Sequence, residues 1–257
     1  RGPAYTFTNG GIRNYYWENV GGGDGFDVMP DPDDANWIYS MSQGGNVGKQ
    51  NVKTGERWFI KPPSVDLNIK LRFNWNSAIA QDPFDNNTVY YGSQFLHKSS
   101  NKGAAWEIIS PDLTTNNPDQ QKQDETGGLT LDITGAETFN TIITIAPSPK
   151  QKGVLWVGTD DGNIQLTIDG GKTWTNFRGK IPGMPLGCWI PQVKASAHNA
   201  GEVFVVANDY RRGDMKPYIF RTADYGKTWT RMIDENKVKG YALCVQQDPA
   251  EPNLIFV

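Results

Sequence analysis

The sequence predicts an all-β protein, a β-propeller of four-stranded blades, and three observations lead to this prediction. The motif Thr-x-Asp-x-Gly-Lys-Thr-Trp-Thr occurs twice, at residues 167–175 and 222–230. A short apolar strand, a turn with Pro or Asp and a second strand recur along the whole chain. No segment longer than about two turns shows the helical period, which argues against alternating strands and helices. Four short strands in each ~50 residues are typical of propeller blades.

The recurring strand pairs predict where the blades lie. Aligned on the second strand, the equivalent residues are Ile38, Val89, Leu155, Phe204 and Ile255, at intervals of 51, 66, 49 and 51 residues. We predict a single propeller segment over 1–257, with blades at about 20–60, 70–108, 138–178 and 187–233 and the start of another at 240–257. Four blades are complete and others partial, so we expect a fragment of a larger propeller.

The longest interval contains a large insertion at residues 110–140, rich in Asn, Asp, Gln and Thr. This composition predicts a surface loop between two blades. Long loops on a rigid scaffold often carry function, so this loop is a candidate contact region.

Composition excludes several functional classes. The net charge is −3 and there is no basic run, so we expect no nucleic-acid partner. No stretch approaches the ~20 apolar residues that span a bilayer, so we expect no direct membrane insertion. The two cysteines, Cys188 and Cys244, form no metal-binding cluster, and either a disulfide or two free thiols is open. We expect no metal and no cofactor.

Each residue type in the repeated motif has a role in folding. Asp accepts backbone N–H groups within its own turn, Gly allows positive φ, and Trp supplies an apolar plate between blades. The residues concerned are Thr167, Asp169, Gly171 and Trp174 in one copy and Thr222, Asp224, Gly226 and Trp229 in the other. We therefore expect a structural role for the motif and look for chemistry elsewhere.

The two copies resemble the Asp-box, also called the bacterial neuraminidase repeat, and residues 99–106, SSNKGAAW, resemble a degenerate copy. In known families this box lies on the propeller rim, away from the ligand-binding centre. It occurs in sialidases, xyloglucan-active glycosidases, sortilin-type receptors and photosystem assembly factors. The resemblance thus implies an architecture and leaves the function open.

A wider resemblance extends over nearly the whole chain, through stretches such as GGGDGFDVMPDP, GTDDGNIQLTIDGGKTWTNF and KPYIFRTADYGKTWT. It is to large bacterial sortilin-like or "glycosyl hydrolase, BNR repeat" propeller proteins. This resemblance implies a secreted or cell-surface bacterial protein with a chain several times longer. Sialidase activity is disfavoured, because no arginine lies in the Arg-Ile-Pro context of the first sialidase arginine.

A propeller glycosidase needs two carboxylates that face each other across a cleft. Asp24 is the candidate catalytic residue, because the glycine run before it leads directly into the innermost strand of a blade. Its partner is unidentified, and the alternative for Asp24 is a turn residue that caps the strand. Asp160 and Asp161 lie on a later turn and are second choices.

Aromatic and polar residues before the innermost strands of the first two blades are candidate ligand-binding residues. They are suited to stacking on a sugar or clamping a peptide, and buried packing between blades is the alternative. The candidate ligand-binding set is Arg13, Tyr15, Tyr16, Trp17, Arg72, Trp75, Asp160 and Asp161.

These features favour a binding or assembly module that engages a protein or glycan partner, including within a cell-envelope complex. The first alternative is a glycoside hydrolase that uses Asp24 and a second carboxylate. The second alternative is a structural subunit of an envelope or secretion complex.

Overall fold

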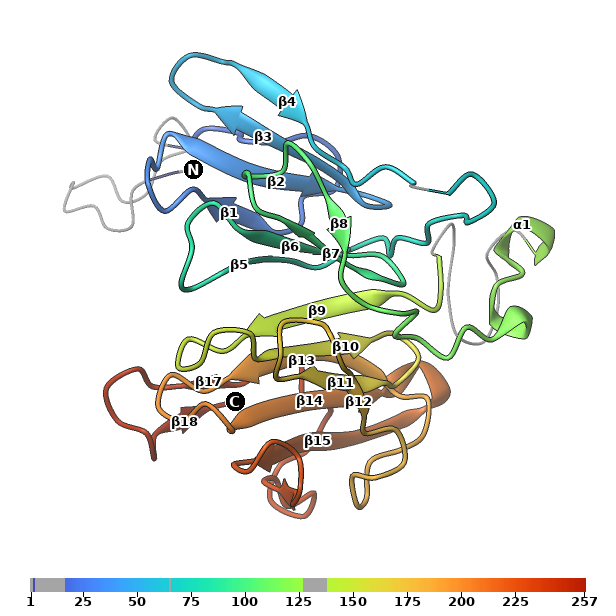
Figure 1. Cartoon of the computed structure of the whole chain (residues 1–257). Coiled ribbons are helices and arrows are strands. Elements are labelled where there is room, and N and C mark those ends of the chain that lie inside the picture. Colours follow the sequence, from blue (N-terminus) through green and yellow to red (C-terminus); the bar gives the residue numbers. More distant parts are fainter. Residues whose placement is uncertain (1, 3–16, 65, 127–137) are drawn as a thin grey trace.

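The computed structural model describes residues 2, 17–64, 66–126 and 138–257, and these residues form an all-β structure (Figure 1). Four antiparallel sheets contain four strands each, and a fifth sheet contains two. In every four-stranded sheet the strands are neighbours in the order of the sequence. This meander of four strands is the geometry of a propeller blade, and it confirms the predicted fold class.

The bounds of the elements are as follows. The first sheet comprises β1 (Val28–Pro30), β2 (Trp37–Ser42), β3 (Asn46–Asn51) and β4 (Arg57–Phe59), and the second β5 (Ile79–Gln81), β6 (Val89–Gly92), β7 (Leu96–Ser99) and β8 (Glu107–Ile108). The third comprises β9 (Ile142–Pro147), β10 (Leu155–Thr159), β11 (Ile164–Thr167) and β12 (Thr175–Asn176), and the fourth β13 (Trp189–Ala195), β14 (Val203–Asp209), β15 (Asp214–Thr222) and β16 (Thr230–Arg231). The fifth comprises β17 (Gln246–Gln247) and β18 (Ile255–Phe256), and the short helices are η2 (Pro118–Gln120), α1 (Gln123–Thr126) and η3 (Tyr210–Arg212).

The turn between the first and second strands is the same in all five sheets. In each, a backbone N–H at the end of the first strand donates to the carbonyl six positions later, as from Asp31 to Trp37 at 2.8 Å and from Ser196 to Glu202 at 3.0 Å. The residue that donates this backbone N–H also uses its side chain, which accepts a hydrogen bond from the backbone N–H two residues later. An example is Asp82 Oδ1, which accepts the Phe84 N–H at 2.8 Å. An Asp or Ser at this position therefore sets the hairpin geometry.

This shared turn corrects the alignment of the fourth blade. The residue after the accepting carbonyl is Ile38, Val89, Leu155, Val203 or Ile255, so Val203 takes the equivalent position and the expected Phe204 lies one residue further along. The distinction matters because a shift of one residue exchanges the two faces of a strand. Val203 packs toward the third sheet, whereas Phe204 packs toward the fifth.

The apolar core lies between neighbouring sheets. On β10, Leu155 and Val157 pack in one cluster with Tyr90 and Leu96 of the second sheet. Trp156, between them in sequence, packs with the fourth sheet and is fully buried. Because successive side chains of a strand point to opposite faces, one central strand supplies both inter-blade interfaces.

The two repeated motifs form identical turns at the β11–β12 and β15–β16 connections. Asp169 Oδ1 accepts the Thr173 N–H at 2.9 Å and its Oδ2 accepts the Thr173 hydroxyl at 2.7 Å, while Gly171 donates to Thr167 Oγ1 at 2.9 Å. Thr222, Asp224, Gly226 and Thr228 repeat these bonds at the same distances. The bonds to its carboxylate, first that from the Thr173 hydroxyl, lower the pKa of Asp169 to about 2.

The motif turns also contact the preceding blade. The indole of Trp106 donates to the Ile60 carbonyl at 2.8 Å, and that of Trp174 donates to the Ile109 carbonyl at 3.2 Å. Both carbonyls belong to the residue just after the last strand of the preceding sheet. Gly171, at φ +100°, approaches the same Ile109 carbonyl so closely that a Cβ would lie 2.4 Å from its oxygen. The turns therefore hold neighbouring blades together.

None of the helices in the described parts of the chain is long and apolar enough to cross a membrane. Cys188 is buried, Cys244 is exposed, and both are free thiols.

Candidate functional site

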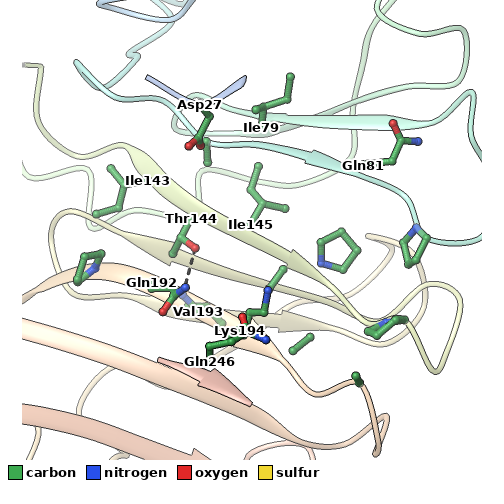
Figure 2. Close-up of a pocket in the computed structure, with 18 of the residues that line it drawn as sticks. Asp27, Ile79, Gln81, Ile143, Thr144, Ile145, Gln192, Val193, Lys194 and Gln246 are labelled. Carbon is green, nitrogen blue, oxygen red and sulfur yellow. Dashed lines mark hydrogen bonds between the residues drawn. The ribbon is translucent and has the colours of Figure 1, made fainter. Parts of the chain in front are cut away.

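The first strands of neighbouring sheets lie beside one another and line a groove of about 540 Å³ (Figure 2). Strand β5 packs against β9, and β9 packs against β13. Each of these strands pairs with only one strand of its own sheet, so its other edge faces the groove. Innermost strands that surround an axis form the central channel of a propeller.

Consecutive residues of β9 and of β13 line the groove. On β9, Ile142, Thr144 and Ala146 are buried, and Ile143 and Ile145 are half-buried in the groove wall. The other groove residues that carry a polar group are Asp27, Asn76, Gln81, Gln192, Lys194, Gln246 and Gln247. The groove thus combines an aliphatic wall with amide groups, a mixture typical of small-ligand sites.

Asp27 is the acidic residue among the described residues that line this groove, and it lies just before β1 (Figure 2). Asp27 as a whole residue is exposed to solvent. The protein atoms that surround it in the groove remove hydration from the carboxylate and raise its pKa. A carboxyl group with a raised pKa holds its proton closer to neutral pH, as a general acid must.

Strand register identifies the residues of other blades that are equivalent to Asp27. Asp27, Thr144 and Gln192 are equivalent, because the residues after them, Val28, Ile145 and Val193, pair with equivalent positions of the second strands. Thr144 Oγ1 accepts the Val193 N–H at 3.1 Å, and Gln192 Oε1 accepts the N–H of Val245 at 2.6 Å.

Thr144 and Gln192 therefore link one innermost strand to the next. The Asp27 carboxyl makes no such link within the described chain, so its oxygens are free to contact a ligand in the groove.

Asp24 lies in an exposed bend three residues before Asp27 and does not line the groove. Its catalytic role stays a prediction. Trp17 is 50% exposed, and Trp75 is half-buried with its carbonyl accepting the Gly44 N–H at 3.2 Å. Arg13, Tyr15 and Tyr16 lie outside the described residues.

Arg72 fastens the insertion to the propeller. Its guanidinium donates to Asp112 Oδ2 at 2.7 Å and to the Asn140 carbonyl at 3.1 Å, so it joins both ends of the inserted loop. Its backbone N–H donates to Gln94 Oε1 at 2.8 Å. With only 11% of its side chain exposed, this arginine has a structural position, and its role in ligand binding stays a prediction.

Asp160 and Asp161 are both 1% exposed and lie against the same loop. Asp161 Oδ2 accepts the Thr115 N–H and hydroxyl, both at 2.7 Å. Asp160 accepts the Thr141 N–H at 2.8 Å, and burial, together with the charge of Asp161, raises its pKa well above the usual value. Buried and hydrogen-bonded in this way, the pair favours an anchoring role; direct ligand binding stays a prediction.

Sequence reasoning missed Asp27, although it stands in the same GGGDGFDV stretch as Asp24. Its position in the sequence could have identified it, because Asp27 directly precedes Val28, the first residue of β1, and so continues the alternation of side chains along that strand. No group of three His, Cys, Asp or Glu side chains in the described ranges could hold a metal ion.

Comparison with known proteins supports the fold and finds partial similarity to two xyloglucanases. No protein-family model matches the chain. An oligoxyloglucan-reducing end-specific xyloglucanase from Emericella nidulans is 33% identical over 100 residues, which cover 38% of this chain and 12% of that enzyme. A xyloglucanase from a Paenibacillus species is 33% identical over 162 residues, which cover 58% of this chain and 15% of that enzyme. The matches therefore span about one seventh of these relatives at most.

Among solved structures, the Dos1 propeller superimposes with a TM-score of 0.52 at 13% identity, over 83% of this chain and 50% of that one. The four meander sheets together with this likeness define the chain as a β-propeller. The similarity to xyloglucanases favours the glycoside hydrolase alternative over the binding or assembly role that the sequence favoured.

Proposed function

We propose that this chain is part of a glycoside hydrolase-type propeller that binds a glycan in the central groove and uses Asp27 as its general acid. The observation that carries the proposal is the free Asp27 carboxyl with a raised pKa in a groove of about 540 Å³. The partial similarity to two xyloglucanases supports the reaction class.

Cleavage of a glycosidic bond in the groove requires an acid, a second carboxylate and contacts that hold the sugar. The protonated Asp27 carboxyl donates to the glycosidic oxygen as the bond to the sugar breaks. On the opposite side of the sugar, a second carboxylate at about 5–10 Å from the first either takes a proton from the water molecule that adds to the anomeric carbon or adds to that carbon itself. We propose Asp24, which the sequence singles out, for this role; it lies on an exposed bend outside the groove lining, so the proposal requires a glycan that extends from the groove to that bend. Ile143 and Ile145 offer an apolar wall to a sugar ring.

We further propose that the repeated turns are Asp-boxes and that the chain belongs with the sortilin-like propeller proteins of the bacterial cell surface. The identical hydrogen bonds in both motif copies support the Asp-box assignment. In this proposal residues 1–257 form one propeller segment, and the protein is secreted or held at the cell surface.

The test measures hydrolysis of xyloglucan oligosaccharides by the chain and by three variants. Asp27→Asn and Asp24→Asn are expected to lower kcat/KM by roughly a hundredfold or more, the usual contribution of a positioned acid or base. Asp34→Asn is the control, because it removes the same charge from an exposed turn outside the groove. Activity is expected to fall as pH rises above the raised pKa of Asp27, because the acid must be protonated. Full activity of Asp27→Asn would refute its role, and full activity of Asp24→Asn would refute the pairing.

The second candidate is a binding module without hydrolysis. It is favoured by the single acidic side chain among the described groove residues, since hydrolysis requires two carboxylates. Binding of the oligosaccharide by the wild-type chain, with no new reducing ends after long incubation, would support this candidate. Absence of both binding and hydrolysis would refute both functions.

A further inference from the structure

A second polar site lies at the start of β13, the strand that also carries Gln192 and Lys194 into the groove. Here Trp189, Tyr210, Arg211 and Tyr241 form a continuous stack. The Arg211 guanidinium lies 3.8 Å above the Trp189 ring centre and 4.9 Å from that of Tyr210. The Tyr210 and Tyr241 rings are stacked at 4.7 Å. The stack fixes the plane of the guanidinium and leaves its N–H groups at the edge.

The charge of Arg211 is not neutralised by an ion pair in the described structure. Its neighbour Arg212 is bound to Asp209 at 2.6 Å and to the Leu186 carbonyl at 2.7 Å. Arg211, in contrast, makes no ion pair and no hydrogen bond with any described acceptor. A guanidinium with free donors is suited to bidentate recognition of a carboxylate.

Beside this arginine lies a hollow of about 20 Å³, lined by Phe139, Asp160, Trp189 and Asn208 among others. Asn208 is 1% exposed, and its Oδ1 atom is buried without a hydrogen-bond donor. A buried acceptor without a partner costs about 1–3 kcal/mol, so this atom favours a donor from a ligand or water. The hollow has room for one water molecule or one hydroxyl group.

Two carboxyl groups of the described residues line the hollow beside Arg211, those of Asp160 and Asp209. The Asp209 carboxylate is paired with Arg212 at 2.6 Å. Asp160, which lines the hollow, carries a pKa raised well above the usual value, chiefly because it is buried. It is therefore a weak source of negative charge beside Arg211. Burial that disfavours the charged form of Asp160, and the ion pair between Asp209 and Arg212, leave the charge of Arg211 available to a ligand.

We propose that Arg211 and Asn208 form a subsite for an acidic sugar, a uronic acid unit of the glycan that the propeller binds. The sugar carboxylate would bind the free edge of the Arg211 guanidinium, and a hydroxyl would enter the hollow and donate to Asn208 Oδ1. This inference rests on the proposed glycan-binding function and adds the charge of the substrate to it.

The test measures binding of three oligosaccharides to the chain by calorimetry. They are a trigalacturonate, its fully methyl-esterified form and a neutral xyloglucan heptasaccharide. The acid is expected to bind roughly tenfold or more tightly than its ester, the usual gain from a charge-assisted hydrogen bond. This preference is expected to disappear in Arg211→Gln and to weaken in Asn208→Ala.

Arg57→Gln is the matched control, because it removes the same charge from the exposed strand β4. Equal affinity for acid and ester, or the same loss in Arg57→Gln as in Arg211→Gln, would overturn the acidic subsite. If the neutral heptasaccharide binds while the acid gains nothing, only this inference fails. If none of the three binds, the proposed glycan function fails with it.

Discussion

Two adjacent glycines in the first motif offer a direct test of how the blades are held together. Gly170 and Gly171 both have positive φ, +73° and +100°. A Cβ on Gly170 would meet no atom within 4 Å, whereas a Cβ on Gly171 would lie 2.4 Å from the Ile109 carbonyl oxygen of the preceding blade. Replacing each by alanine therefore imposes backbone strain at both positions and an inter-blade clash at only one.

The expected magnitudes follow from these two costs. The left-handed conformation costs a non-glycine residue about 1–2 kcal/mol, so Gly170→Ala is expected to lose about 1 kcal/mol of the free energy of unfolding after the smaller unfolded-state entropy is counted. Gly171→Ala adds an overpacking cost of about 1–3 kcal/mol, because the Ile109 backbone cannot swing away as a side chain can. We expect a total of about 2–4 kcal/mol.

The assay is thermal unfolding followed by circular dichroism, with urea unfolding as a second measurement. For a chain of this size 1 kcal/mol corresponds to a shift of about 2–4 °C in Tm. The added cost of about 1–3 kcal/mol therefore places the Tm of Gly171→Ala about 2–12 °C below that of Gly170→Ala. Equal losses in the two variants would show that the contact with Ile109 does not determine the effect, and would refute the proposed role of this glycine.

Two further predictions concern the carboxylate and arginine networks. Asp169→Asn is expected to destabilise the chain at neutral pH. Because folding lowers the pKa of Asp169 to about 2, its stabilising contribution is present above pH 4 and is lost as pH falls toward 2. The difference in unfolding midpoint between wild type and variant should therefore close over that range, and a difference independent of pH would contradict this. Arg72→Ala is expected to cost about 2 kcal/mol of stability and to speed tryptic cleavage at Lys122, because it removes the bonds to Asp112 and Asn140. Arg57→Ala, on an exposed strand, should leave cleavage at Lys122 unchanged. Equal cleavage rates in both variants would exclude Arg72 as the anchor of the inserted loop.

Much of the fold was predictable because each blade repeats local signals. The turn after each first strand depends on one Asp or Ser side chain and on a fixed six-residue spacing, both visible in the sequence. The one error in alignment, Phe204 in place of Val203, arose in a run of apolar residues where alternation cannot show the register. Only the hydrogen bond from Ser196 to Glu202 settles it.

The candidate site was less predictable, because its residues come from different blades. Asp24 and Asp27 stand in the same glycine-rich stretch, and nothing in that stretch alone shows which carboxyl enters the groove. Arg72 shows the same limit, since its contacts lie 40 residues away at Asp112 and 68 residues away at Asn140.

The sequence by itself determined the all-β class, the blade period and the motif turns, because these depend on contacts within about ten residues. The tertiary structure alone decided that Asp27 faces the groove, that Asp160 is buried, and that Arg211 stacks beside an unpartnered Asn208. The physical reason is that a strand has two faces, and which face meets a neighbouring blade or the groove depends on the packing of separate blades.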